Sequence, residues 1–191
     1  MAFIMPNCVK LAKFSLIVVL LLLPNLASAE DYGVIVRHVA LIESESGYQL
    51  DTEIDYQLSP VAKEALEKGV PLTWDIRLEI RRPGFLWTRL VYKKKLRQTL
   101  QYHALLKQYE VKTSEQPTEM FLTLSAALNF MSLPRHQDMI DLVLIENNQR
   151  YMLAARSRFN RELLPVPLRP FTYIHSEWYL SSPWFIWPIQ K

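Results

Sequence analysis

Histidine is the residue type of this chain best suited to bind a metal ion or to move a proton near neutral pH. The four histidines, His38, His103, His136 and His175, are scattered, and no two of them have the spacing of paired metal ligands. A metal site would therefore have to be assembled from distant segments. Isolated histidines more often lie at the surface or cap a backbone group, so we predict no metal site and no cofactor.

A nucleophile with its base is equally hard to place. The sequence has no Gly-x-Ser-x-Gly elbow or other local catalytic signature. Ser176 lies between His175 and Glu177, but adjacent residues of a strand point to opposite faces, so they would not form a relay. We therefore predict no catalytic residue and no enzymatic activity, with a hydrolase of unrecognised site as one alternative.

Three carboxylates, Asp51, Glu53 and Asp55, occupy alternate positions and would share one face of a strand. Successive members would be about 6.5–7 Å apart. They could bind a cation, or they could lie across from Arg77 and Arg81 on a neighbouring strand. We expect the cross-strand pairing, because opposite charges on adjacent strands stabilise a sheet.

A basic run offers a candidate binding surface. Its cations could bind anionic lipid headgroups or an acidic partner, although such runs more often form a solvated sheet edge that discourages aggregation. The run comprises Arg89, Lys93, Lys94, Lys95 and Arg97, interleaved with Trp87 and Tyr92.

Tryptophans of the C-terminal segment offer a second candidate surface. We expect Trp178 to pack into the core, because it lies in an alternating stretch. Trp184 and Trp187 are bracketed by prolines, and for them closing the core and forming an exposed aromatic groove are equally good interpretations.

Two segments that must position these groups alternate apolar and polar residues. Residues 48–58 and residues 72–80 both show this period of two, which is typical of antiparallel strands with one buried face. The polar face of the second segment, from Thr73 to Arg81, is expected to face water. Between the two, a short helix is predicted over residues 60–68, with Ser59 as its N-cap and Gly69 after its end.

Later segments are predicted from the same signals. Residues 82–84 suit a turn, residues 85–92 a strand covered on both sides, and residues 96–111 favour strand over helix. Thr118 or Thr123 could cap a helix that ends before Pro134 and has the apolar stripe Phe121, Leu124, Ala127, Leu128 and Met131.

The last third of the chain combines a hairpin with a proline-rich stretch. Residues 139–145 and 151–159 suit two strands joined by a turn at residues 146–149. Three prolines predict an extended, polyproline-like path over residues 163–171. The whole pattern predicts a mainly antiparallel β fold, a sandwich or twisted sheet of about seven strands with two short helices.

The N-terminus has the features of a secretory signal peptide. Lys10 and Lys13 precede an uncharged run of about ten residues, which is short for a membrane-spanning helix. Ala27-Ser28-Ala29 then forms a small-x-small cleavage site before Glu30. We predict a leader at residues 1–29 and a single exported domain at residues 30–191, with no membrane span after cleavage.

Composition narrows the partners of the exported domain. The leader carries two of the 22 basic residues and none of the 19 acidic ones, so the rest is nearly neutral and has no general attraction to nucleic acid. The single cysteine, Cys8, lies in the leader. The exported domain would therefore contain no disulfide and no thiol nucleophile.

Several motifs resemble one known family, the proteobacterial domain of unknown function 4390, also called proline-rich signal peptide protein. Its most specific features correspond here to Pro165, Pro167, Trp178, Ser182 and Trp184. The resemblance is carried by Leu58–Pro60, Ala65–Leu72, Arg81–Pro83, Gln108–Tyr109, Leu124–Leu128, Leu164–Leu168 and Ser176–Trp184.

The resemblance implies an envelope protein of Gram-negative bacteria whose gene tends to neighbour a sensor histidine kinase, and it supplies no catalytic residues. We therefore expect a non-enzymatic periplasmic interaction domain, with that kinase as a candidate protein partner. The alternative is a periplasmic carrier of an apolar or glycan ligand.

Overall fold

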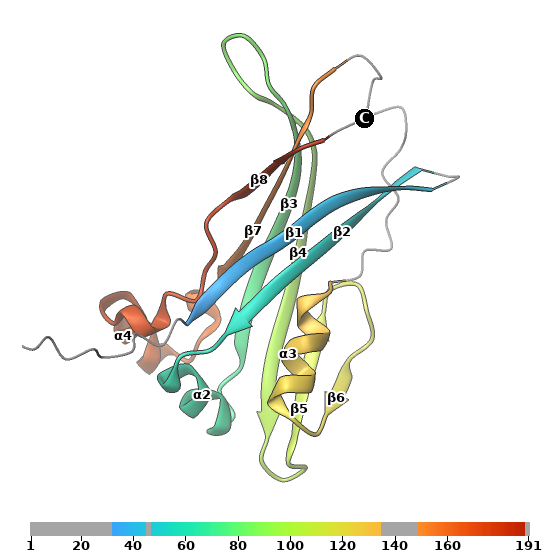
Figure 1. The fold of residues 1–191 in the computed structure, drawn as a ribbon. Helices are drawn as coiled ribbons and strands as arrows, with labels where there is room; N and C mark the ends of the chain where they lie inside the picture. The colour runs from blue at the N-terminus through green and yellow to red at the C-terminus, as the bar shows by residue number, and fades with distance from the viewer. Residues whose placement is uncertain (1–31, 45–46, 135–148, 190–191) are drawn as a thin grey trace, which may run out of the picture. The chain divides into compact units, whose positions relative to one another are not determined.

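Eight strands and three α-helices make up the part of the chain that the structure describes (Figure 1). It is a computed structural model, and it describes residues 32–44, 47–134 and 149–189. The strands are β1 (Gly33–Ser44), β2 (Gly47–Gln57), β3 (Leu72–Arg82), β4 (Arg89–His103), β5 (Gln108–Thr113), β6 (Glu119–Phe121), β7 (Met152–Phe159) and β8 (Phe185–Pro188). The helices are α2 (Pro60–Glu67), α3 (Leu124–Ser132) and α4 (Arg169–Ile174), and the 3₁₀ turns are η2 (Arg161–Leu163), η3 (Val166–Leu168) and η4 (Ser176–Trp178).

The strands form two antiparallel sheets. β1 and β2 form a two-stranded sheet, and the other six strands form a sheet in the order β6-β5-β4-β3-β7-β8. The predicted class, mainly antiparallel β with short helices, is confirmed. β3 and β4 are the central pair of the larger sheet.

The core lies between the β1–β2 hairpin and the apolar face of the larger sheet. Leu50, Ile54 and Tyr56 of β2 are buried, as the alternation predicts. The ring centroid of Tyr56 lies 5.3 Å from that of the fully buried Trp74 on β3. Trp74 also donates its indole N–H to the carbonyl oxygen of Leu180 at 2.9 Å. Burial of each such side chain stabilises the fold by about 1.5–3 kcal/mol.

β3 is covered on both faces, which differs from the prediction that its polar face meets water. Thr73 and Glu79 are buried, and Asp75, Arg77 and Arg81 are only half-buried. The cause is the position of β3 between β4 and β7, because directly paired residues of the two neighbouring strands lie on the same face beside its polar side chains. The polar face of the central strand β3 is therefore partly enclosed.

The segment after β3 is a loop, not the strand predicted over residues 85–92. The next strand begins only at Arg89, and the loop of residues 83–88 is exposed. Gly84 allows the chain to fold back here, because a Cβ atom at this position would lie 2.5 Å from the carbonyl oxygen of Trp87. The end of β4 and most of β5 lie within residues 96–111, so the prediction of strand rather than helix is confirmed there.

Helix caps were predicted well. The Ser59 hydroxyl accepts the N–H of Ala62 at 3.1 Å, and Gly69 has a φ of +82° after the end of α2. Thr123, one of the two predicted caps, begins α3, and Met131 of the predicted stripe is fully buried.

The proline-rich stretch is helical, so the extended path predicted over residues 163–171 is wrong. η3 and α4 occupy most of it. Pro167 and Pro170 lie in the first turns of these two elements, where the fixed φ of proline suits a helix and its missing N–H costs nothing. Trp178 then packs into the core, as predicted, with 3 % of its surface exposed.

Several predicted features fall outside the described residues. They are the leader at residues 1–29, the strand over residues 139–145, the turn at residues 146–148 and His136. Within the described segments, no helix has the length and apolar character that a bilayer crossing requires.

Candidate functional site

A basic cleft of about 520 Å³ lies on the polar face of the larger sheet. Strands β3, β4 and β7 form its floor, and residues from the stretch 160–181 form its wall. We define the basic cleft by the charged side chains that line it, which are Arg77, Lys95, Arg97, Arg156, Arg158, Arg161, Asp75 and Glu162. Cations outnumber carboxylates among these residues by six to two.

Strand register brings three cations side by side on the floor. Arg77 of β3 is paired directly with Lys95 of β4 on one side and with Arg156 of β7 on the other. Directly paired residues of antiparallel strands share a face, with Cβ atoms about 4.5–5.5 Å apart. The register therefore makes a row of three positive charges across the sheet.

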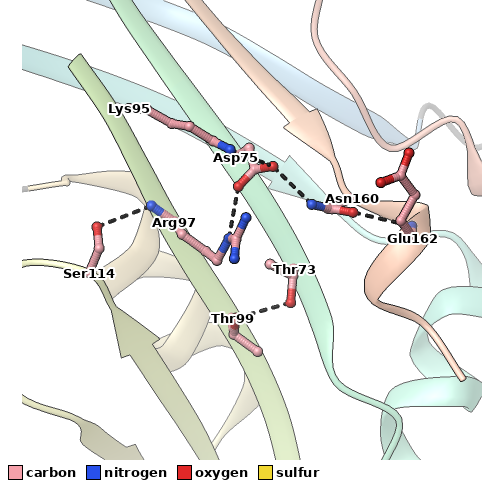
Figure 2. A network of polar contacts seen from close by, with 8 residues as sticks. All are labelled: Thr73, Asp75, Lys95, Arg97, Thr99, Ser114, Asn160 and Glu162. Atoms are coloured by element: carbon pink, nitrogen blue, oxygen red, sulfur yellow. Dashed lines mark hydrogen bonds and ion pairs between the residues drawn. The ribbon is translucent and has the colours of Figure 1, made fainter.

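The neighbouring row of the register has a carboxylate at its centre, since Asp75 lies between Arg97 and Arg158. Figure 2 shows the contacts of Asp75. Its Oδ1 accepts the Nε–H of Arg97 at 2.9 Å, its Oδ2 accepts the side-chain amide of Asn160 at 2.9 Å, and Lys95 Nζ lies 3.4 Å from Oδ2. Partial burial opposes ionisation of Asp75. The hydrogen bonds from Arg97 and Asn160 and the charges of Arg97 and Lys95 outweigh it and hold the pKa of Asp75 below its ordinary value.

The other arginines of the floor have no such partner. Arg156 donates its Nε–H to the backbone carbonyl of Ser182 at 3.2 Å. Among the residues that the structure describes, no carboxylate forms an ion pair with Arg77, Arg156 or Arg158. Their positive charges are therefore available to an anion.

Arg161 and Asn160 build the wall. The Arg161 guanidinium lies 4.9 Å from the ring centroid of Tyr179 and 5.2 Å from that of Tyr173, in cation–π contacts. Asn160 caps η2 by accepting the N–H of Glu162 at 3.2 Å and donates to Asp75 on the floor. Asn160 thus fixes the wall to the sheet, as Figure 2 shows.

This arrangement is suited to binding anions. Like charges directly opposite each other destabilise a sheet, and a bound anion offsets that repulsion. Guanidinium groups also present paired N–H donors to carboxylate or phosphate oxygens. The floor therefore combines an electrostatic reason to bind an anion with donors that suit one.

The predicted basic surface divides between two faces and a loop. Lys95 and Arg97 line the basic cleft. Lys94 is on the opposite face and forms an ion pair with Glu115. The remaining predicted members do not line the cleft: Trp87 is exposed on the loop, Tyr92 packs against the core, and Arg89 and Lys93 are exposed nearer the start of β4.

Trp184 and Trp187, for which the sequence left two interpretations, lie at β8 and do not line the basic cleft. The guanidinium of Arg81 lies over the half-buried ring of Trp184, 4.5 Å from its centroid. Trp187 is 50 % exposed and lies nearly parallel to Phe185 at a centroid distance of 6.2 Å. Of the other family-motif residues, Ser182 is buried whereas Pro165 and Pro167 are exposed.

The predicted pairing between acidic residues of β2 and arginines of β3 is wrong. β2 pairs only with β1 and lies in a different sheet from β3. Asp55 instead forms an ion pair with Arg37, and Arg81 with Glu79 at 2.6 Å. The carboxylates concerned are Asp51, Glu53 and Asp55, and the expected partners were Arg77 and Arg81.

The three histidines that the structure describes do not gather into a site. His38 and His175 are exposed, and His103 Nε2 lies 2.8 Å from Glu110 Oε2. Among the described residues, no group of three or more His, Cys, Asp and Glu side chains could hold a metal ion. His175, Ser176 and Glu177 lie at and within η4, so the strand assumed for them is wrong.

Sequence reasoning missed the part of the basic cleft that β7 supplies. Arg156 and Arg158 alternate with buried residues of β7 and therefore share its polar face. The alternation of residues 151–159 was recognised, and two arginines at positions that face away from the core were a usable signal. The position of Arg161 on the wall depends on η2, which no sequence pattern indicated.

The fold and the cleft define a small antiparallel β domain with a basic cleft on one face of its larger sheet. The chain belongs to the family described as Domain of unknown function (DUF4390), which matches residues 32–188. The resemblance seen in the sequence is thereby confirmed. Comparisons with curated proteins and with solved structures gave no match.

Proposed function

We propose that this DUF4390 protein is an exported, non-enzymatic domain of the cell envelope that binds an acidic segment of a partner protein in the basic cleft. The observation that carries the proposal is the row Lys95–Arg77–Arg156, in which register forces three cations together. Hydrophobic burial does not explain why charged side chains occupy these three positions. A stable sheet would place a carboxylate or a neutral residue at the central position.

The spacing of the cations favours an extended acidic chain. Arg156 and Arg158 are two positions apart on β7, and Lys95 and Arg97 are two positions apart on β4. Each pair is therefore separated by about 6.5–7 Å along its strand. Alternate side chains of an extended peptide have the same repeat, so acidic residues at every second position match the spacing of Arg156 and Arg158 along β7.

The lining of the cleft favours this proposal over a carrier of apolar ligands. The volume is in the range of about 300–1,000 Å³ that is usual for ligand sites. Its lining, however, consists mainly of charged and polar side chains. The sensor histidine kinase implied by the family resemblance is a candidate partner, through an acidic part of its extracytoplasmic segment.

Fluorescence anisotropy with a labelled peptide of alternating glutamate and serine tests the proposal. We expect saturable binding to the purified exported protein that weakens steeply between about 50 and 300 mM salt, because screening shortens the range of charge attraction. Replacing both Arg77→Gln and Arg156→Gln should weaken binding at least about tenfold, since each lost charge-assisted hydrogen bond contributes about 1.5–3 kcal/mol.

The matched control removes the same charge elsewhere. Lys63→Gln with Lys112→Gln also changes the net charge by two, but both lysines are exposed outside the cleft, so peptide affinity should change little. Equal losses in the two double variants would contradict a site and indicate general charge attraction. The cleft variant should remain folded, because it removes like-charge repulsion.

A competition arm separates proteins from other polyanions. A sulfated oligosaccharide and a short single-stranded DNA are added to the labelled peptide complex. We expect the unlabelled peptide to compete better than either at equal charge concentration. Stronger competition by the oligosaccharide or the DNA would overturn the acidic-protein assignment.

A further inference from the structure

The loop between β3 and β4 exposes three consecutive large apolar side chains. Phe85, Leu86 and Trp87 are 102 %, 73 % and 80 % exposed, respectively. The loop is the turn at the top of Figure 1 that joins the two longest neighbouring strands of the sheet. We call residues 83–88 the apolar tip.

The apolar tip is held in a tight turn. A Cβ atom on Gly84 would lie 2.5 Å from the carbonyl oxygen of Trp87, so the backbone closes on itself across residues 84–87. Such a short, closed turn has no interior in which to bury its own side chains. Exposure of Phe85, Leu86 and Trp87 is therefore a consequence of the backbone path.

The charged residues that flank the apolar tip along the chain, from Arg81 to Lys107, are all basic. The sequence contains no Asp or Glu between Glu79 and Glu110. Arg82 and Arg89 end and begin the two strands that carry the loop and are paired with each other across the hairpin. Lys93, four residues after Arg89 on β4, is exposed.

More apolar surface lies at the same end of the sheet. Leu90 is 49 % exposed directly after the loop, and Trp187 of β8 is 50 % exposed. Register places Trp187 opposite Leu153 of β7, which is itself opposite Ile80 of β3. Trp187 is therefore two strands away from β3, level with Ile80, which is two residues before the end of that strand.

We propose that the apolar tip inserts into the interfacial layer of a membrane that contains anionic lipids. Trp and Phe are favoured at that depth, and arginines beside them can bind phosphate headgroups. A loop of six residues is too small for a stable protein interface, which usually buries about 800 Å² on each partner. A few apolar side chains with a basic collar are sufficient for reversible attachment to a membrane surface.

Vesicle co-sedimentation tests this proposal on the purified exported protein. Vesicles of phosphatidylethanolamine and phosphatidylglycerol are compared with vesicles of phosphatidylcholine alone. We expect binding to the anionic vesicles. Combining Phe85→Ser with Trp87→Ser should weaken this binding at least about tenfold, because two rings that would insert into the membrane are lost. Absence of binding by the unmodified protein would overturn the proposal.

The other end of β4 provides a matched control. Leu105 and Leu106 are 99 % and 62 % exposed in the turn after β4. That strand has 15 residues, which places the two turns about 50 Å apart. Leu105→Ser with Leu106→Ser should leave vesicle binding unchanged, and a loss equal to that of the tip variant would refute a specific tip.

A third variant separates the apolar tip from the basic cleft. Arg77→Gln with Arg156→Gln removes cleft charges but leaves residues 83–88 intact. We expect it to bind vesicles as the unmodified protein does and to fail in binding the acidic peptide. Loss of vesicle binding in this variant with retention in the tip variant would assign the lipid contact to the cleft. Circular dichroism of each variant checks the fold, and we expect the tip variant to remain folded because both replaced side chains are exposed.

Discussion

Arg77 and Asp75 occupy equivalent positions on β3, but they have opposite charges between similar neighbours. Both lie between two cations in the strand register: Asp75 between Arg97 and Arg158, and Arg77 between Lys95 and Arg156. One carboxylate with several donors stabilises the floor, and the next row is left with excess positive charge. Stability at this site thus depends on Asp75, and the proposed binding depends on Arg77.

The Asp75 network predicts a pH-dependent contribution to stability. Because the pKa of Asp75 is lowered in the folded state, its contribution is fully present above the pKa of the unfolded chain, about 3.9, and is lost as the pH falls through the folded-state value. Asp75→Asn should therefore reduce the free energy of unfolding at pH 7, by about 2 kcal/mol for lost bonds to a charged group.

Urea unfolding at pH 7 and near pH 3 measures the effect. The difference between the unmodified protein and the Asp75→Asn variant should be largest at pH 7 and should shrink at low pH, where the native carboxyl is increasingly protonated. Asp51→Asn, at an exposed position on β2, serves as the control and should have little effect at either pH. A difference that does not change with pH would contradict the role assigned to Asp75.

At the scale of single elements, local sequence patterns determined the strands and helices with a strong periodicity or a cap. β2 shows the expected alternation of burial, and α2 and α3 begin at the predicted caps. The patterns failed where tertiary position decides. Proline in a first helical turn looks the same in sequence as proline in an extended segment, and the solvation of the polar face of β3 depends on which strands flank it.

The basic cleft shows the same division. Lys95 and Arg97 were recognised because they belong to one basic run, but Arg156, Arg158 and Arg161 come from a segment more than fifty positions later in the chain. They lie close to Lys95 and Arg97 because β3 pairs with both β4 and β7. Pairing over such sequence distances is not encoded in any local period.

The edge of β7 depends on serine hydroxyls as well as on β8. β8 pairs with Met152–Ala155 only. Beyond it, the Ser182 hydroxyl accepts the backbone N–H of Ser157 at 2.9 Å, and the Ser181 hydroxyl accepts that of Phe159 at 2.9 Å. These side chains replace the carbonyl acceptors that a longer β8 would supply.

Ser182→Ala should therefore destabilise the protein. The buried N–H of Ser157 would lose its acceptor, which costs about 1–3 kcal/mol. Urea unfolding measures this loss, and amide hydrogen exchange at Ser157 should become faster. Ser176→Ala, at an exposed position of η4, is the matched control. Equal stability of the two variants would contradict the role of the Ser182 hydroxyl.

At the scale of the whole molecule, the two proposed surfaces belong to one strand pair. Arg77 of the basic cleft and Arg82 at the base of the apolar tip are five positions apart on β3, a separation of about 17 Å. A domain attached to a membrane through residues 83–88 would thus hold the basic cleft near the lipid surface. Segments of membrane proteins that emerge from the bilayer would meet it there.

Both proposals require the chain to leave the cytoplasm, which gives the last prediction. Export with cleavage after Ala29 should yield a periplasmic protein whose first residue is Glu30, because the small side chains of Ala27 and Ala29 suit a signal peptidase. Since Cys8 is the single cysteine of the chain, the processed protein should also lose all reactivity toward maleimide. Intact mass and maleimide labelling of the periplasmic fraction measure both consequences together.

Ala29→Lys supplies the control, because a long charged side chain at the cleavage position blocks processing. This variant should remain in the membrane fraction with its thiol still reactive, whereas Glu30→Gln, on the other side of the predicted bond, should be processed normally. Unmodified protein found in the cytosol with residues 1–29 attached would refute export. The acidic-peptide and vesicle measurements would then describe surfaces of a protein in a different compartment, with different partners available to it.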